Sequence, residues 1–164
     1  MSPPDDNFAR ALTSETLRSV HAAWKNLAAG RIGPRRSELK PGHLRRATPF
    51  TFTLDVLEGG KDFRLGFAGD RVVQFFTPSP SAPADSNLVF FEEAKALIRC
   101  CIGARKPLAS GPKPTRYAGK EHLEREVLLL PLSDDGVTVT GLLGALETWR
   151  LGTHPHSTVP VLAD

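Results

Sequence analysis

The sequence predicts an α+β fold in a single domain. Three observations support this fold class: an amphipathic helical pattern near the N-terminus, a change to alternating apolar and polar residues at residue 49, and an Asp-Asp-Gly hairpin signal at residues 134–136. Two runs of strands separated by a helical stretch favour an antiparallel sheet over alternating βαβ units. We expect a disordered arm over residues 1–13, the domain over residues 14–150 and a flexible tail over residues 151–164.

The first helix is predicted over residues 14–29. Ser14 stands at the N-cap position, and Gly30 stands where a helix commonly stops. Between them, apolar residues recur at helical spacing: Leu17, Val20 and Trp24. These three side chains are expected either to enter the core or to form the interface of a homodimer.

Residues 31–46, RIGPRRSELKPGHLRR, form a basic connector. They contain six arginines and lysines against one acid, Glu38, whereas the net charge of the whole chain is only +3. The remainder of the chain is therefore slightly acidic, and a nucleic-acid partner, which would need a wider basic face, is not predicted. Gly33-Pro34 and Pro41-Gly42 interrupt the stretch, so it is not one long basic helix.

Two antiparallel strands are predicted next, over residues 49–57 and 62–68, joined by a turn at residues 58–61. Apolar residues alternate with polar ones in the first strand, and the alternation resumes in the second. The predicted inner face consists of Phe50, Phe52, Leu54, Val56, Phe63, Leu65 and Phe67.

The second half of the chain combines helical and strand patterns. We expect a short helix at 70–76, a proline-rich loop at 77–86, a helix at 88–103, an edge strand or irregular excursion at 107–117, and strands on both sides of residues 134–136.

Several motifs occur in a fixed order. Trp24 and Gly30 close the first helix, and Gly30-x-x-x-Pro34-x-Arg36 follows them. The later motifs are Pro41-Gly42-His43-Leu44, Phe63-Arg64 with Gly69, and a hairpin with LLLPL at 128–132, Asp135-Gly136 and LLGAL at 142–146. Together they resemble the PAS domain family, and most closely its small single-domain members from alphaproteobacteria.

The resemblance implies a five-stranded antiparallel sheet with helices on one face and an N-terminal flanking helix. It also implies a non-enzymatic sensory or interaction module of bacterial signalling, which binds a small ligand or a signalling protein and often forms a homodimer. From inward alternation and helical phase, the cavity of such a domain is expected to be lined by Phe52, Leu54, Phe67, Leu97, Ile98, Leu130 and Leu143.

The sequence contains no signature of catalysis or of a common cofactor. The helix at 88–103 has no histidine to bind haem, the flavin-binding GxNCRFLQ motif does not occur, and there is no G-x-S-x-G elbow. His154 and His156 form a close pair without a third ligand, so no metal site is predicted. The identity of any cofactor stays open, and an enzyme is not predicted.

The arginines of the connector suggest a second function. Arg31-x-x-x-Arg35 matches the short motif by which PilZ-type domains bind cyclic di-GMP, and Arg36 lies beside it. The D/N-x-S-x-x-G segment that accompanies this motif does not occur. We therefore favour a structural interpretation, in which Pro34 and Arg36 shape the turn from helix to sheet and Arg36 pairs with a carboxylate. A receptor for cyclic di-GMP or another phosphate ligand, and a structural adaptor with no ligand, stay as alternatives.

The chain is expected to be cytoplasmic. Cys100 and Cys101 are adjacent in a helical pattern, which favours free thiols in a reducing compartment. No signal peptide is recognised, and no apolar run approaches the roughly 20 residues of a membrane-spanning helix, so membrane insertion is not predicted.

Overall fold

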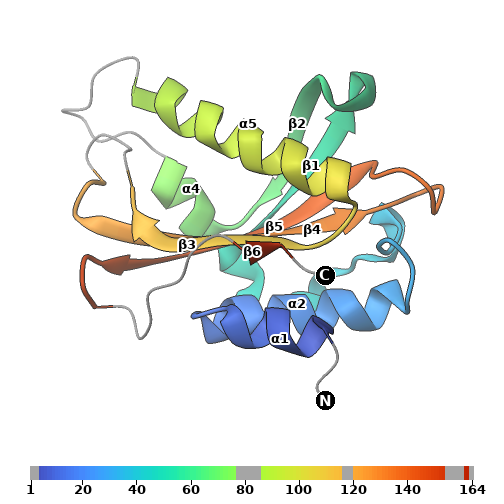
Figure 1. Ribbon diagram of the computed structural model, residues 1–164, viewed down its shortest axis with the longest axis horizontal. Coiled ribbons are helices and arrows are strands. Elements are labelled where there is room, and N and C mark those ends of the chain that lie inside the picture. The colour runs from blue at the N-terminus through green and yellow to red at the C-terminus, as the bar shows by residue number, and fades with distance from the viewer. Residues whose placement is uncertain (1–3, 77–85, 116–119, 154–160, 163–164) are drawn as a thin grey trace.

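A six-stranded antiparallel sheet forms the middle layer of the protein (Figure 1). The computed structural model describes residues 4–76, 86–115, 120–153 and 161–162. The strands follow the order β2-β1-β5-β4-β3-β6 across the sheet. They are β1 (Thr51–Leu57), β2 (Asp62–Ala68), β3 (Leu108–Pro114), β4 (Leu123–Leu132), β5 (Gly141–Arg150) and β6 (Val161–Leu162).

Helices cover both faces of the sheet. Helices α1 and α2 lie against one face, and α4 and α5 lie against the other (Figure 1). The helices are α1 (Pro4–Ala11), α2 (Glu15–Ala28), α3 (Pro41–Leu44), α4 (Asp70–Phe76) and α5 (Ser86–Ala104), with short 3-10 helices at Arg36–Glu38, Arg45–Phe50 and Glu58–Gly60. The predicted α+β class with its antiparallel sheet and N-terminal helix is confirmed.

Among the described residues, both ends of the chain contain regular secondary structure. Pro4–Ala11 forms α1 where a disordered arm was expected, because Phe8 and Leu12 are buried against the core. A proline is tolerated in the first turn of a helix, so Pro4 does not prevent this helix. At the other end, Val161–Leu162 adds a sixth, two-residue strand beside β3, within the predicted tail. The predicted loop at 77–86 lies, apart from Ser86, outside the described residues.

Strands β4 and β5 form the centre of the sheet and pair over ten residue positions without a register shift. Both faces of β4 are covered, which is why its sequence is apolar at nearly every position from 127 to 132. Leu128, Leu130 and Leu132 belong to the core under α2. Val127 and Leu129 belong to the core under α4 and α5. We call these two sets of buried residues the α2-side core and the α5-side core.

A β-bulge interrupts the pairing of β1 with β2. Phe52 pairs with Ala68 but Leu54 pairs with Leu65, so two residues of β2, Gly66 and Phe67, lie opposite the single residue Thr53, and β2 has one extra residue at this point. The Phe67 N–H donates a hydrogen bond to the Thr53 hydroxyl at 2.9 Å instead of joining the regular ladder. Phe67 is consequently 44% exposed, and the prediction that it lies on the inner face is wrong.

Candidate functional site

Helix α2 is part of the folded core. Leu17 and Val20 are fully buried and Trp24 is nearly so, all in the α2-side core. The Trp24 indole Nε1–H also donates to the Pro131 carbonyl of β4 at 2.7 Å. The three predicted interface side chains therefore face the sheet of their own chain, and their assignment to a dimer interface is wrong. The amphipathic pattern was read correctly, but its apolar side is covered by β4 and β5.

The connector docks on the hairpin between β4 and β5. A side chain at Gly33 would overlap the Pro131 carbonyl, so only glycine allows this close approach. One residue further on, the Pro34 carbonyl accepts a hydrogen bond from the Ser133 N–H at 3.0 Å. The Gly-Pro pair of the sequence motif thus holds the chain against β4 as it passes from α2 to the sheet.

Arg36 links the connector to two other elements. Its backbone N–H donates to the Asp134 carboxylate at 3.0 Å, and its guanidinium Nη2 donates to the Thr53 hydroxyl on β1, also at 3.0 Å. The carboxylate contact expected for Arg36 therefore exists, but the backbone makes it and the guanidinium is directed to the β1–β2 bulge. These contacts assign Arg36 a structural role.

The Arg31 side chain binds Glu38 and the last carbonyl groups of α2. Its guanidinium contacts both carboxylate oxygens of Glu38, at 2.9 and 3.0 Å, and donates to the carbonyls of Leu27 and Ala28. The hydrogen bond from Arg31, with a further one from the Arg35 backbone N–H, lowers the pKa of Glu38 to about 2. Arg31 is thus directed toward Glu38.

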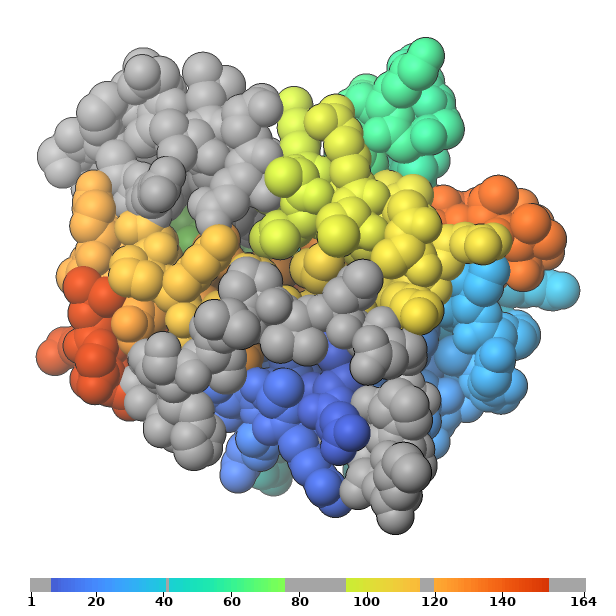
Figure 2. All heavy atoms as spheres, viewed as in Figure 1, coloured from blue at the N-terminus to red at the C-terminus, as the bar shows by residue number. Residues whose placement is uncertain are grey.

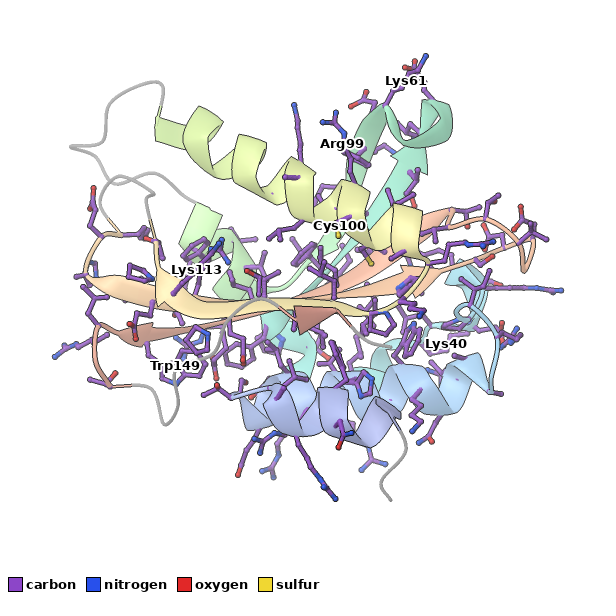
Figure 3. All side chains as sticks on the ribbon, viewed as in Figure 1. Lys40, Lys61, Arg99, Cys100, Lys113 and Trp149 are labelled. Atoms are coloured by element: carbon purple, nitrogen blue, oxygen red, sulfur yellow. The ribbon has the colours of Figure 1, made fainter. Side chains whose placement is uncertain are left out.

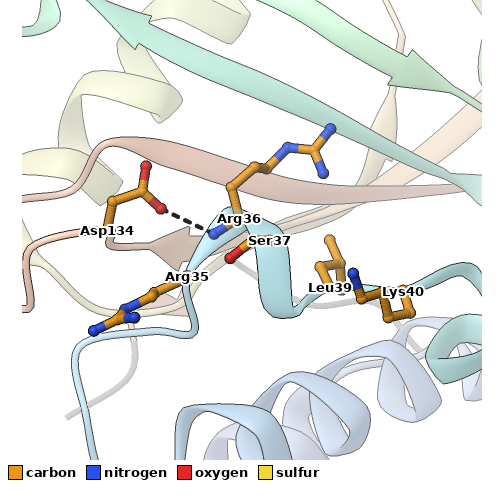
Figure 4. A pocket seen from close by; sticks show the side chains of 6 residues that line it. All are labelled: Arg35, Arg36, Ser37, Leu39, Lys40 and Asp134. Carbon is orange, nitrogen blue, oxygen red and sulfur yellow. Dashed lines mark hydrogen bonds between the residues drawn. The ribbon is translucent and has the colours of Figure 1, made fainter.

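Arg35 and Arg36 line an open surface hollow of about 620 Å³, together with Ser37, Leu39, Lys40 and Asp134. In Figure 4 the guanidinium groups of Arg35 and Arg36 point in different directions. Because a phosphate site needs donors that converge, the geometry does not assemble the predicted phosphate-binding candidates Arg31, Arg35 and Arg36 around one ligand.

The seven predicted pocket residues do not line one cavity. Leu130 and Leu143 lie in the α2-side core, whereas Phe52 and Ile98 lie in the α5-side core. Leu54 and Leu97 are partly buried against the α5-side core, and Phe67 is exposed. The prediction of which residues of β4 and β5 face α5 was wrong. Leu129 and Leu142 lie on that side of the sheet, whereas Leu130 and Leu143 lie on the α2 side. Phe52 lies in the α5-side core, with its ring in the space that a side chain at Gly144 would take.

The two cores differ in how completely they are covered. Among the described residues, the α2-side core has a single partly buried apolar neighbour, Leu39, whereas the α5-side core has seven. Several of the seven lie on α5 and on the β1–β2 hairpin. The sheet face under α5 is therefore less closed than the face under α2.

The open part of this face is an apolar patch on the β1–β2 hairpin. Leu54 pairs directly with Leu65, and Val56 pairs with Phe63, so all four side chains share the α5 side of the hairpin. Leu65 is 56% exposed and the others are partly buried. We call Leu54, Val56, Phe63 and Leu65 the hairpin patch. Figure 2 shows the end of this hairpin projecting from the surface beside α5, and Lys61 lies at its tip (Figure 3).

The sequence reasoning also missed three buried polar residues. Glu126 on β4 is buried and faces α2, while Arg125 on β4 and Ser110 on β3 are buried on the opposite face. Burial raises the pKa of Glu126, and the backbone N–H groups of Thr13 and Ser14 oppose that effect. Glu126 follows Glu124 and Arg125 in a charged run at the start of β4, so the local sequence contains no signal that distinguishes it as buried.

Few groups in the described part of the chain are suited to catalysis. Burial and the neighbouring Cys100 raise the pKa of the Cys101 thiol to about 12, so this thiol is not activated. Within residues 4–76, 86–115, 120–153 and 161–162, no cluster of three or more His, Cys, Asp or Glu side chains is arranged to hold a metal ion. His154 and His156 lie outside these residues. None of the helices described is both long enough and apolar enough to span a membrane.

An antiparallel sheet with helices α1 and α2 on one face and α4 and α5 on the other places the chain in the class of small α+β domains. Within that class, the sequence profile of the PAS domain matches residues 12–147, and the chain belongs to the PAS domain family. The match confirms the predicted family and indicates a sensory or interaction role. No curated protein and no solved structure matches the chain.

Proposed function

We propose that the protein is a non-enzymatic PAS module that binds a protein partner in signalling through the hairpin patch. The observation that supports this function is the exposure of Leu65 next to the partly buried Leu54 and Phe63, on the less closed side of the sheet. Clustered apolar side chains at a surface are typical of protein interaction sites.

The surroundings of the patch suit such an interface. Lys61 at the hairpin tip and Arg99 on α5 are exposed, so two basic side chains lie near the apolar centre, whereas Arg64 points to the opposite side of the hairpin and pairs with Asp55. An apolar centre with a polar rim is the usual anatomy of an interface, and this rim favours an acidic partner surface. Strand β2 is also the edge of the sheet, so it pairs with β1 on one side only.

The partner is a second signalling protein or a second copy of this chain. A homodimer through α2 is not proposed again, because Leu17, Val20 and Trp24 are buried in the core. The hypothesis of a cyclic di-GMP receptor is weakened, because the Arg31 side chain, which would have to bind the ligand, forms an ion pair with Glu38. A structural adaptor without a ligand would have the same fold, and only binding experiments separate it from a sensor.

The test compares Leu65→Glu with Val137→Glu. Val137 is the matched control because it is also an exposed apolar residue, 62% exposed, but lies between β4 and β5. A photo-crosslinking amino acid at position 61 is expected to capture a partner, or a second copy, in cells. Leu65→Glu should reduce this capture about tenfold or more, because it places a charge in the interface. Capture that is equal in both variants would contradict the proposal.

Sedimentation velocity of the purified protein then identifies the kind of partner. A wild-type dimer that Leu65→Glu dissociates, and Val137→Glu does not, supports self-association through the patch. A wild-type monomer together with a captured second protein supports a signalling partner.

A further inference from the structure

The open hollow beside the connector is basic, and it lies apart from the hairpin patch. Its volume is about 620 Å³, and its walls are formed by Arg35, Arg36, Ser37, Leu39, Lys40 and Asp134. Three of these side chains are cations, and Asp134 is the single carboxylate among them. The hollow therefore attracts negative charge. We call it the connector hollow.

The backbone that forms the connector hollow is fixed by contacts to the rest of the chain. The Arg35 N–H donates to the Glu38 carboxylate at 2.9 Å, and the Arg36 N–H donates to the Asp134 carboxylate at 3.0 Å. Leu39 packs against the α2-side core. Because the walls are in place before a partner arrives, binding there costs little ordering of the protein.

Two of the three cations are available to a partner. The side chains of Arg35 and Lys40 are exposed, and neither forms a hydrogen bond or an ion pair with another residue in the described part of the chain. Figure 4 shows them on opposite sides of Ser37, whose side chain lies between them and is also exposed. The hollow thus presents two separated positive charges with a hydroxyl group between them.

We infer that the connector hollow binds an extended acidic segment of a partner protein, in which two different carboxylates contact Arg35 and Lys40. Cations that lie apart do not converge on one phosphate, but they match carboxylates that are spaced along a peptide. An open hollow also suits a chain that crosses it better than a small molecule, which is usually enclosed by its pocket. None of the six lining residues is aromatic, so the hollow offers no stacking platform for single-stranded nucleic acid.

The experiment uses the full chain and a dye-labelled decapeptide of alternating Glu and Ser, with a decapeptide of alternating Gln and Ser as the neutral counterpart. Fluorescence anisotropy should show saturable binding of the acidic peptide and at least about tenfold weaker binding of the neutral one, because the charged contacts are lost. Absence of saturable binding, or equal binding of both peptides, would overturn the inference. A thymidine oligonucleotide of equal charge that binds more tightly than the acidic peptide would overturn it as well.

Matched double variants separate the hollow from the net charge of the protein. Arg35→Gln combined with Lys40→Gln should weaken binding of the acidic peptide about fivefold or more, since two exposed charge contacts are lost. Arg10→Gln combined with Arg150→Gln removes the same charge from exposed positions on α1 and β5, and this variant should bind as the wild type does. Equal weakening in the two double variants would show that only net charge matters, and would contradict the inference.

Photo-crosslinking locates the bound peptide. A photo-reactive amino acid in place of Ser37 should capture the acidic peptide, whereas the same replacement of Ser19, an exposed serine on α2, should not. Equal capture from both positions would contradict a site in the hollow. These variants do not alter the hairpin patch, so the result is independent of the proposed function.

Discussion

The buried carboxylate of Glu126 accepts the backbone N–H of Ser14, the N-cap residue of α2, at 2.8 Å. Its second oxygen accepts the Thr13 N–H at the same distance. Glu126 on β4 thereby holds the turn between α1 and α2 against the sheet and places a negative charge at the N-terminal end of a helix dipole. This contact joins residues that are more than 100 positions apart in the sequence.

Replacement of Glu126 should destabilise the protein. In Glu126→Gln, one of the two acceptor oxygens becomes an NH₂ group that faces a backbone donor, so one buried N–H loses its partner. We expect the free energy of unfolding to fall by about 1–3 kcal/mol. Urea denaturation measures the effect. The control is Glu58→Gln, an exposed carboxyl in the β1–β2 turn, and an equal loss in both variants would contradict the role of Glu126.

Glu126 should make the protein more stable at acidic pH than at neutral pH. Burial raises the pKa of Glu126, so the folded protein binds this proton more tightly than the unfolded chain. This contribution to the free energy of unfolding is complete below the ordinary carboxyl pKa of 4.5. It is lost as the pH rises through the pKa of Glu126 in the folded protein. Glu147, the cross-strand partner of Glu126, has a raised pKa for the same reason and adds the same trend.

The comparison of wild type with Glu126→Gln isolates the contribution of Glu126. The advantage of the wild type in free energy of unfolding should grow as the pH is lowered from 7 toward 4.5. Denaturation at several pH values measures it. If the difference in free energy of unfolding between wild type and Glu126→Gln became smaller on acidification, the hydrogen bonds from Thr13 and Ser14 would lower the pKa of Glu126 by more than burial raises it, and the prediction would be wrong.

Gly33→Ala should destabilise the docking of the connector. A Cβ at this position would overlap the Pro131 carbonyl, which is backbone and cannot move aside. We expect a loss of about 1–3 kcal/mol in the free energy of unfolding. Gly42→Ala is the matched control in the same connector, because a Cβ there meets nothing within 4 Å. Thermal unfolding of the two variants should differ clearly, and similar melting temperatures would refute the close approach.

Arg36→Lys should be more harmful than the same change at the neighbouring residue. Lysine cannot reproduce the planar guanidinium that reaches Thr53 from the connector, so the half-buried hydrogen bond is lost. The expected cost is about 0.5–1.5 kcal/mol. Arg35→Lys should be nearly neutral, since the Arg35 side chain is exposed. Chemical denaturation of both variants decides the matter, and equal stability would remove the structural role of Arg36.

Periodicity predicted the elements well where one face of each is polar. The first helix was expected at 14–29 and is Glu15–Ala28, and the strands expected at 49–57 and 62–68 are Thr51–Leu57 and Asp62–Ala68. In each case charged or polar residues alternate with apolar ones, so the covered side can be recognised. The PAS family was recognised from the order of its motifs, which lie both in strands, as LLLPL and LLGAL do, and in turns, as Asp135-Gly136 does.

Periodicity failed where both faces are apolar. In LLLPL every position is apolar, because β4 is covered by α2 on one side and by α5 on the other. Alternation then contains no information about which leucine faces which helix, and Leu130 was placed on the wrong side. The bulges in β2 and β3 add shifts in register that no local pattern indicates.

The sequence by itself determined the α+β class and the extent of the first helix and the β1–β2 strands, because those follow from local periodicity and turn chemistry, and its ordered motifs resembled the PAS family. Only the tertiary structure decided that Arg31 binds Glu38, that Leu17, Val20 and Trp24 are core, and that Arg35, Ser37 and Lys40 line one hollow. These outcomes depend on strand register and on which surfaces cover one another. A side chain's partner is chosen by contacts between distant segments, and local spacing does not contain that information.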